Sequence, residues 1–318
     1  MRGLLTSLVV FLLVCPAAHG WNAAGHKTTA AIAFELLKSD QRKPIIAILG
    51  QHPRFGEDFV AHMPAHVENG GSDTQEKWLL EQAAIWPDLV KRLDKTIQAE
   101  YNKGRWHYIN MPVWLTDEDE AALTDKLSHN MATDFFPTMQ SNLNVIQALR
   151  GNLEIWRDKS STDGDKALAL CWILHLTGDL HQPLHAVALF SRTYFPRGDR
   201  GGNSIKVVWG NGTQNLHAVW DGLPSSMEDL EPEDSTSQSI ADDSVDEDVA
   251  IDYWLHENAD LARQFVYTDD LKAQLRVRMD AKEPPTVNLS HEYLDSARSL
   301  ARQQVKLAGQ RIARLIIP

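Results

Sequence analysis

Residues 172–185, WILHLTGDLHQPLH, place three histidines and an aspartate on a segment whose other residues are typical of a buried helix. His175 and Asp179 are four residues apart, so on a helix they point from one face, about 40° apart. Burying an unpaired carboxylate is costly, which weakens the interpretation of this pair as ordinary core residues. A histidine and a carboxylate at this spacing make good zinc ligands. Pro183 should break the helix, so His185 could bind a neighbouring metal rather than the same one.

The same four-residue spacing recurs in NLHAVWDGL, where His217 and Asp221 are flanked by apolar residues. Two such pairs on otherwise apolar faces are difficult to attribute to chance. Asp88 in AAIWPDLVKR and His107 in RWHYIN would be ordinary by themselves, as a helix-capping aspartate and a half-buried histidine. In the company of the two pairs, both become candidate metal ligands.

The first 20 residues contain an early arginine, a short apolar run and small residues just before Trp21, which predicts a secretory signal peptide. We expect cleavage before Trp21 and a secreted or periplasmic protein made of residues 21–318. Cleavage would free the amine of Trp21, which could chelate a metal together with the carbonyl oxygen of the same residue. His26 follows five residues later, at the start of a predicted helix.

Apolar residues recur at three- and four-residue intervals through most of the chain, which predicts helices. The predicted helices cover residues 26–37, 76–86, 135–153, 166–180, 250–267 and 292–317. The clearest strand signal is NSIKVVWG at 203–210, which runs into the turn-forming NGT and predicts a short β-hairpin. Residues 224–248 are rich in Asp and Glu and predict a solvated loop. The expected fold class is all-α, with one mainly helical domain over residues 21–318 and long loops.

Charge and cysteine content narrow the choice of protein class. The formal net charge is −12, and losing Arg2 with the signal peptide makes it −13. This negative net charge argues against a protein that binds duplex DNA through a basic surface alone. Cys15 lies in the predicted signal peptide, so Cys171 would remain alone and could form no internal disulfide. Bound metal is one candidate source of rigidity. No apolar run is long enough to span a membrane, and we expect a monomer with no membrane partner.

Taken in order, the motifs resemble those of the S1/P1 nuclease family, the three-zinc, single-strand-specific nucleases. The matching stretches are WNAAGH, WPD, HYIN, HLTGDLHQPLH, GDRGGN and LHAVWDGL, and they cover nearly all of residues 21–318. The resemblance implies a helical fold of the phospholipase C/nuclease P1 type and three zinc ions. It assigns one zinc to Asp88, His107, His175 and Asp179, a second to Asp179, Trp21 and His26, and a third to His185, His217 and Asp221.

The resemblance also implies an activity. Members of the family hydrolyse single-stranded DNA and RNA to 5′-phosphate products and remove the phosphate of 3′-nucleotides. Two zinc ions about 3.5–4 Å apart can activate a water molecule for this hydrolysis. Lys91, three residues after the first aspartate, would contact the phosphate beside the catalytic Asp88 and Asp179. By the same resemblance His181 is not a ligand, and we expect it either to support the ligands from behind or to serve in packing.

Base recognition is implied for a further set of residues, which by resemblance are Tyr108, Asn110 and Asn203. Tyr108 would stack on an unpaired base, although a core aromatic with an exposed hydroxyl is the simpler interpretation. Asn110 stands where fungal members have aspartate. An amide can donate as well as accept hydrogen bonds, so base preference is left open.

Two other classes of protein fit part of the pattern. The zinc-dependent phospholipases C have a similar metal site and an N-terminal tryptophan. Their last ligand is usually Glu where this chain has Asp221, and their spacing from tryptophan to histidine is longer than five residues. A secreted zinc-sequestering protein would need neither Lys91 nor an open aromatic platform.

Overall fold

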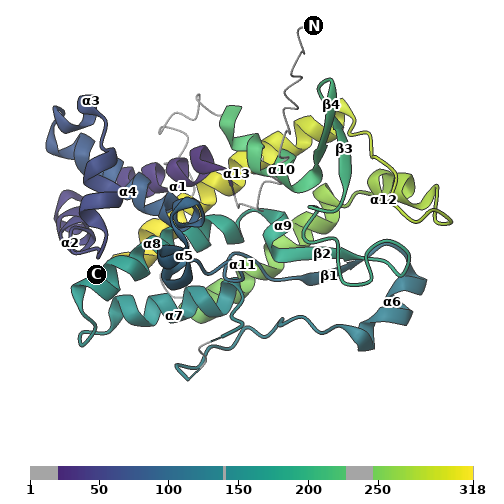
Figure 1. The fold of residues 1–318 in the computed structure, drawn as a ribbon, viewed down its shortest axis with the longest axis horizontal. Coiled ribbons are helices and arrows are strands. Elements are labelled where there is room, and N and C mark those ends of the chain that lie inside the picture. Colours follow the sequence, from purple (N-terminus) through teal and green to yellow (C-terminus); the bar gives the residue numbers. More distant parts are fainter. Residues whose placement is uncertain (1–20, 139–140, 227–245, 318) are drawn as a thin grey trace, which may run out of the picture.

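The structure, a computed structural model, describes residues 21–138, 141–226 and 246–317. The predicted signal peptide, residues 1–20, and most of the acidic segment 224–248 lie outside the described residues. The described chain is mainly helical, which confirms the predicted fold class (Figure 1). Its α-helices are α1 Ala23–Leu36, α2 Ser39–Leu49, α3 Ala65–Glu68, α4 Ser72–Leu89, α5 Lys95–Tyr101, α6 Asp117–Leu123, α7 Val145–Arg157, α8 Asp163–Leu180, α9 Pro183–Ala186, α10 Leu216–Gly222, α11 Glu247–Leu261, α12 Asp269–Arg276 and α13 His291–Leu315.

Helix α8 is the centre of the packing. It contacts α1, α2, α4, α7 and α13, and every residue from Ala169 to Ser191 is buried. The helix begins at a capping Thr162, whose hydroxyl accepts a hydrogen bond from the main-chain N–H of Asp165. It ends at Leu180, and Pro183 is the first residue of α9. Pro183 therefore separates the two helices, as the sequence predicted.

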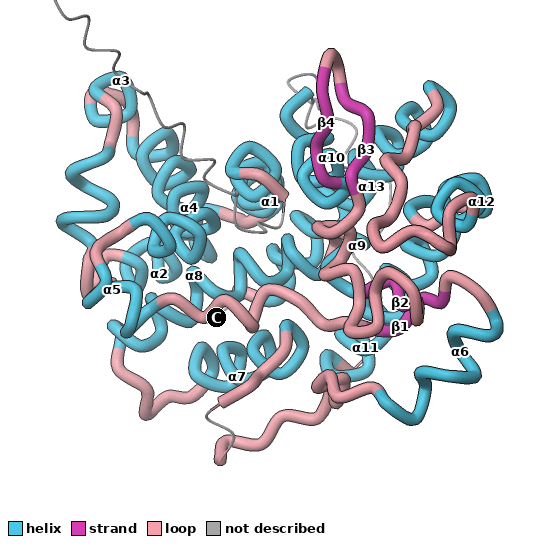
Figure 2. Tube along the Cα trace, turned by 45° about the vertical axis from the view of Figure 1, so that its right-hand side comes forward, coloured by secondary structure: helices cyan, strands magenta, loops and turns pink. Residues whose placement is uncertain are grey.

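Two small sheets flank this helical body. Strands β1 Met111–Trp114 and β2 Val187–Phe190 pair in parallel, with Met111 opposite Val187. Strands β3 Lys206–Trp209 and β4 Gly212–Asn215 form the predicted antiparallel hairpin. Figure 2 shows both pairs on the same side of the molecule, away from α2, α3 and α4. The parallel pair was not predicted, because its four-residue apolar runs show neither alternation nor length enough to separate a strand from a helix.

One predicted helix was partly wrong. Within the segment 135–153, α7 begins at Val145, and the described residues 135–138 and 141–144 are not helical. Pro137 disfavours a helix at the residue before it. Asn144 then begins α7, because its side chain accepts the N–H groups of Ile146 and Gln147. Similarly, α11 ends at Leu261 and continues as one π-helical turn, Ala262–Val266, within the predicted segment 250–267.

Among the described residues, no helix has the length and apolar character needed to cross a membrane. Most of the helices contribute to one hydrophobic core, which buries large side chains such as Trp86, Trp220 and Tyr267.

Helices α1 and α13 approach each other closely at Gly309. A Cβ atom at this position would lie 2.6 Å from Cβ of Ile32 and 2.9 Å from the main-chain oxygen of Thr29. Both contacted atoms are part of, or attached directly to, the α1 backbone, so neither can turn away. The absence of a side chain at Gly309 therefore sets the distance between α13 and α1.

We expect Gly309→Ala to destabilise the protein by about 1–3 kcal/mol through overpacking. Alanine favours a helix by about 1 kcal/mol over glycine, so a loss of stability would show that the contact with α1 dominates. The control is Gly164→Ala in the first turn of α8, where the nearest atom to a Cβ is Gln51 O at 3.5 Å. Urea unfolding of both variants measures the difference. Equal stabilisation of the two would contradict the close approach of α1 and α13.

Candidate metal centre

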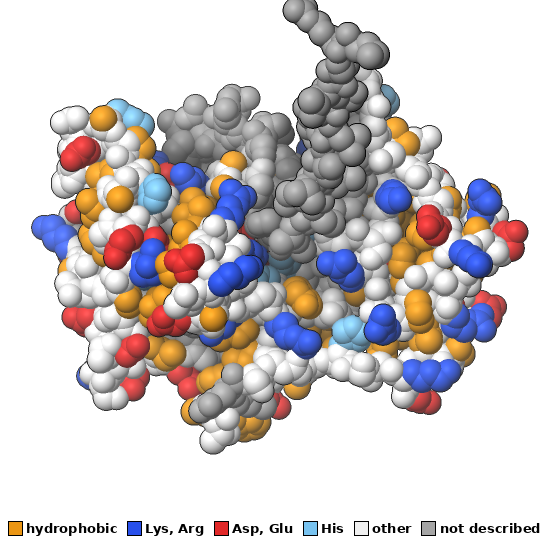
Figure 3. Space-filling model, viewed as in Figure 1, with side chains coloured by type: hydrophobic (Ala, Val, Ile, Leu, Met, Phe, Trp, Pro, Cys, Tyr) orange, Lys and Arg blue, Asp and Glu red, His pale blue; other side chains and the backbone are white. Residues whose placement is uncertain are grey.

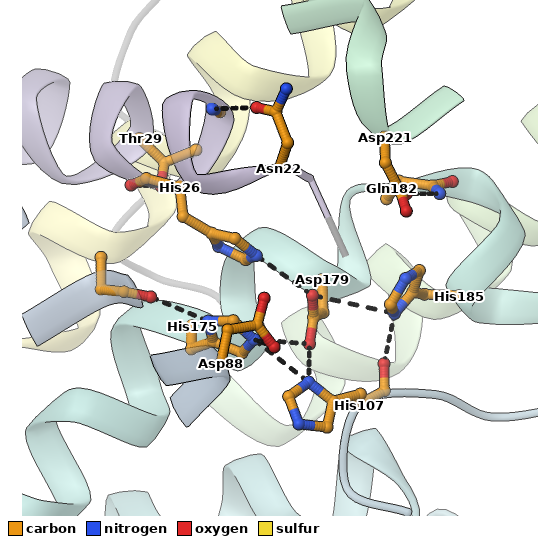
Figure 4. A network of polar contacts seen from close by, with 12 residues as sticks. Asn22, His26, Thr29, Asp88, His107, His175, Asp179, Gln182, His185 and Asp221 are labelled. Atoms are coloured by element: carbon orange, nitrogen blue, oxygen red, sulfur yellow. Dashed lines mark hydrogen bonds and ion pairs between the residues drawn. The ribbon is translucent and has the colours of Figure 1, made fainter. Parts of the chain in front are cut away.

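The predicted ligands come from widely separated parts of the chain and meet around the end of α8 (Figure 4). Each ligand except Asp88, which is half-buried, is a buried side chain. Their positions are His26 on α1, Asp88 in the last turn of α4, His107 in the loop after α5, His175 and Asp179 on α8, His185 on α9, and His217 and Asp221 on α10.

Asp179 lies at the middle of this cluster, as Figure 4 shows. Its carboxylate oxygens are 2.8 Å from His107 Nδ1, 3.3 Å from His26 Nε2, 3.3 Å from His175 Nε2 and 3.8 Å from His185 Nδ1. Burial would raise the pKa of Asp179, but the neighbouring histidines hold that pKa well below its ordinary value. The carboxylate is therefore charged, fully buried and within reach of four imidazole rings.

Asp88 joins the same cluster from the end of α4. Its Oδ1 is 3.7 Å from His175 Nε2 and 2.6 Å from Lys91 Nζ. Burial would raise the pKa of Asp88, but His175 and Lys91 lower it below the ordinary range. Burial lowers the pKa of His175 to about 3, so its ring is neutral at physiological pH and has a lone pair free to bind a metal.

His185, His217 and Asp221 form a separate group. His185 Nε2 lies 3.2 Å from His217 Nε2, which lies 3.4 Å from an Asp221 oxygen. Nδ1 of His185 donates to the carbonyl of His107 at 2.5 Å, and Nδ1 of His217 donates to the carbonyl of Gly201 at 2.6 Å. Each neutral ring has one N–H, so the two facing Nε2 atoms both carry lone pairs. Two lone pairs at this distance repel each other unless a proton or a metal ion lies between them, so the pair is suited to binding a cation.

Three groups of side chains could hold a metal ion, and each keeps its ligand atoms within 4.8 Å of one another. They are His26, His175 and Asp179; Asp88, His107 and His175; and His185, His217 and Asp221. His175 belongs to two of the groups, whereas the family resemblance assigned it to one zinc ion. Asp179 belongs to one group, whereas the resemblance assigned it to two zinc ions. The assignment of the ligands to individual ions stays a prediction.

The interatomic spacings fit zinc. Ligands at about 2.0–2.1 Å from a tetrahedral ion lie about 3.3 Å apart, close to the 3.2–3.4 Å found for several of these pairs. His26 Nε2 and Asp179 Oδ1, which face each other at 3.3 Å, are both buried without a hydrogen-bond partner. Buried polar atoms are normally paired, so these atoms are suited to coordinating an ion.

Trp21 is not part of the three side-chain groups, because its expected contribution comes from main-chain atoms. The residue is fully buried at the start of α1. The next residue, Asn22, donates its main-chain N–H to the Asp221 carbonyl at 3.0 Å and caps α1 through its side chain. These contacts hold the beginning of the described chain between α1, which carries His26, and α10.

Two residues that support the ligands were missed in the sequence. Gly178 makes room for His26, because a Cβ there would lie 2.6 Å from His26 Nδ1. Gln182 donates to Asp221 Oδ1 at 2.8 Å, and its own oxygen accepts the N–H of Leu184. A glycine within an apolar helix was a usable signal for the first. Gln182 gave no such signal.

A third missed residue, Asp199, holds the glycine-rich loop that orients His217. Its buried carboxylate accepts hydrogen bonds from Tyr267 OH at 2.7 Å and from the N–H groups of Leu189 and Gly202 at 2.9 Å. Gly201 in this loop has a φ of +59° and supplies the carbonyl that accepts from His217. A Cβ at Gly201 would lie 2.4 Å from the Leu184 oxygen, so only glycine fits. Burial raises the pKa of Asp199 to about 6.

A cleft of about 680 Å³ opens beside the ligands and is lined by His107, His185 and His217. Lys91 and the three residues assigned to base recognition, Tyr108, Asn110 and Asn203, line the same cleft. Tyr108 is 38 % exposed, which excludes the interpretation as a core aromatic. Asn203 uses its Nδ2 to donate to the Arg200 carbonyl at 2.9 Å, so its side-chain oxygen remains available.

His181 lies beside these residues but outside the three groups. Its Nδ1 donates to the Thr177 carbonyl at 2.6 Å, and its Nε2 lies 2.6 Å from an Arg311 nitrogen. The ring packs near Trp254 and connects α8 to α13. This placement agrees with the packing role, one of the two expected from the sequence.

A helical domain that gathers three His/Asp groups beside one cleft defines a candidate multinuclear metal centre, and the comparisons agree with this class. A sequence model of the S1/P1 Nuclease family matches residues 21–317. The chain therefore belongs to the S1/P1 nuclease family. It is 27 % identical over 222 residues to Nuclease S1 of Aspergillus oryzae, and 24 % identical over 227 residues to Endonuclease 5 of Arabidopsis thaliana. Each alignment covers 70 % of this chain, but only 60 % and 62 % of the respective relatives.

The pKa of Asp199 generates a prediction about stability. Because burial raises the pKa of Asp199 from 3.8 to about 6, ionisation of Asp199 opposes folding. The stabilising contribution of protonated Asp199 to the free energy of unfolding is fully present below about pH 4. It is lost as the pH rises through about 6, a change of about 3 kcal/mol. We expect wild type, relative to Asp199→Asn, to lose that amount between pH 4 and pH 7 in urea unfolding.

Tyr267→Phe provides the matched variant. The Tyr267 hydroxyl lowers the pKa of Asp199 against the effect of burial, so its removal should raise that pKa further. The loss of stability should then be larger than in wild type and extend to higher pH. A stability difference between wild type and Asp199→Asn that does not change with pH would contradict the assignment.

Proposed function

We propose that this chain is an exported, zinc-dependent nuclease. It would hydrolyse single-stranded DNA and RNA to products with 5′-phosphates and remove the phosphate of 3′-nucleotides. The main support is the pair of lone-pair nitrogens on His185 and His217, which face each other at 3.2 Å next to a second cluster centred on Asp179. Family membership supports the same chemistry, and the family is generally zinc-dependent.

Three zinc ions are proposed, held as the family resemblance assigns them. The ligands would be Asp88, His107, His175 and Asp179 for one ion, Asp179, His26 and the main chain of Trp21 for another, and His185, His217 and Asp221 for the third. Bound zinc polarises a phosphate oxygen and lowers the pKa of a bound water, which makes phosphodiester hydrolysis possible at neutral pH. Three carboxylates among the ligands leave three divalent ions with net positive charge beside the cleft.

Lys91 is proposed to bind the reacting phosphate. Its side chain is mostly buried, lines the cleft and is held by Asp88 at 2.6 Å. This contact fixes the ammonium group beside the metal ligands. The side chain is therefore already ordered, and it loses little conformational entropy when it binds a phosphate oxygen. Asp88 thereby has two tasks, as a metal ligand and as the partner that orients Lys91.

Tyr108 is proposed to select single strands. Its ring is exposed in the cleft, and its main chain accepts a hydrogen bond from Val145 N–H at 3.3 Å, which ties it to the start of α7. A base can stack on this ring only when it has left a duplex. Asn110 and Asn203 line the same cleft and can hydrogen-bond the base through neutral amides.

Export is proposed from the signal-like residues 1–20, with cleavage before Trp21 and a secreted or periplasmic location. The family match begins at Trp21, which supports this boundary. Exported as an active enzyme, the protein would not meet the nucleic acids of its own cytoplasm.

The proposal is tested on purified protein that begins at Trp21. We expect about three zinc ions per chain by metal analysis, rapid hydrolysis of single-stranded DNA and phosphate release from a 3′-nucleotide. Duplex DNA and lecithin micelles should be poor substrates. Lecithin hydrolysis without nuclease activity would identify a phospholipase C instead, and zinc binding without any hydrolysis would identify a sequestering protein.

Asp179→Ala should lose two zinc ions together and nearly all nuclease activity, because its carboxylate lies between the histidines of two groups. The matched control is Asp119→Ala, which removes another buried aspartate that binds Arg192 away from the cluster. This control should keep its zinc content. Three zinc ions retained in Asp179→Ala would contradict the bridging role.

The predicted metal chelate at Trp21 can be tested by comparing protein that begins at Trp21 with protein that has one extra residue before it. Within a longer chain the Trp21 nitrogen is an amide, whereas after cleavage it is an amine with an ordinary pKa of about 7.7–8.0 that can bind zinc. Protein with one extra residue before Trp21 should bind less zinc and cleave slowly, and protein starting at Trp21 should be fully active. Identical zinc content and rate would show that the amine is not a ligand.

A further inference from the structure

The charge of the cleft is opposite to that of the whole chain. The formal net charge is −12, yet the described residues that line the cleft include four cations and no Asp or Glu. The cations are Lys91, Arg105, Arg197 and Arg200. On the face shown in Figure 3, several Lys and Arg side chains lie around the histidine atoms visible near its middle, and few acidic side chains lie between them.

The three arginines are available to a ligand. All three are exposed, and within the described parts of the chain none of them forms an ion pair with a carboxylate. Arg105 instead donates to the side-chain oxygen of Asn142, a neutral partner that orients the guanidinium without cancelling its charge. Cations without counter-charges in a cleft attract anions, and arginine binds phosphate through paired N–H groups.

Arg105 and Arg197 line this cleft from different segments of the chain, the loop after α5 and the loop after β2. His129 lines the same cleft.

Arg200 has an unusual backbone. Its φ is +62°, and it stands among Gly198, Gly201 and Gly202, whose φ angles are also positive. The left-handed region suits glycine and is strained for residues with a side chain. A glycine at position 200 would fit this loop without strain, so an exposed arginine held there points to a function for its side chain.

We propose that Arg105, Arg197 and Arg200 form a phosphate-binding subsite for the backbone of a single-stranded polynucleotide. This inference rests on the proposed nuclease function and deepens it. Lys91 lies beside the metal ligands and serves the reacting phosphate, whereas the arginines would hold phosphates of neighbouring nucleotides. The subsite would make the protein prefer a polynucleotide over a mononucleotide, because each additional phosphate finds a cation already in place.

Binding can be measured without catalysis. The probe is a fluorescent single-stranded phosphorothioate oligonucleotide, titrated with zinc-loaded protein at several salt concentrations. For a single strand, each neutralised phosphate adds about 0.7 to the slope of log affinity against log salt. The triple variant Arg105→Gln, Arg197→Gln, Arg200→Gln should therefore lower the slope by about 2, from three such contacts. The matched control is Arg302→Gln, an exposed arginine of α13 outside the cleft.

Hydrolysis gives a second, independent measure. In the triple variant the ratio of kcat/KM for a dodecanucleotide to that for a dinucleotide should fall at least tenfold, mainly through KM. In Arg302→Gln this ratio should match wild type. Arg200→Gly separates binding from folding, because it relieves the strained backbone. It should unfold at the same temperature as wild type or higher and still bind the oligonucleotide more weakly.

An unchanged salt slope in the triple variant would overturn the subsite. So would an equal loss of kcat/KM for the dodecanucleotide and the dinucleotide, because the arginines would then serve the reacting phosphate. Wild-type protein that cleaves neither substrate would instead refute the proposed nuclease function. The salt slope of oligonucleotide binding would still decide whether the arginine subsite exists.

Discussion

A charged carboxylate with no access to solvent is the constraint on which the structure depends. Asp179 is fully buried near the end of α8, whose residues are all buried from Ala169 onward. An isolated ion in such a position would be very costly, so the surrounding chain must supply partners. It does so from α1, the loop after α5, α8 and α9, which bring His26, His107, His175 and His185 to one carboxylate. The tertiary fold is thus organised around the place where these elements meet.

Main-chain carbonyls then orient the imidazole rings. Nδ1 of His175 donates to Ala84 in α4, that of His185 to His107, and that of His217 to Gly201. Each hydrogen bond fixes which nitrogen carries the proton and directs the other lone pair into the cluster. Because the three carbonyls belong to three different segments, the ligand geometry depends on long-range packing. Correctly placed metal ions would stabilise the same packing, in a chain whose described residues contain a single cysteine and no disulfide.

Much of the centre could be predicted from the sequence, because its ligands follow local rules. The spacing of four residues between His175 and Asp179 places both on one helix face, and the same spacing applies to His217 and Asp221. Pro183 was sufficient to separate α8 from α9. Residues whose role depends on distant partners could not be predicted in this way. Asp199 accepts a hydrogen bond from Tyr267, 68 residues away, and β1 pairs with β2 although α6, α7, α8 and α9 lie between these strands in the sequence. Spacing along the sequence contains no information about such contacts.

The distribution of charge connects the fold to its proposed substrate. An acidic chain repels nucleic acid over most of its surface, so binding depends on the few places where cations are concentrated. The glycine-rich loop contributes to both the metal ligands and the cationic cleft. Gly201 orients His217, and Arg200 lines the cleft. A duplex would need a broad basic face, which an excess of acidic side chains does not provide. A flexible single strand can follow a narrow cationic cleft to the metal ligands, so the overall negative charge and the local positive charge both favour unpaired strands.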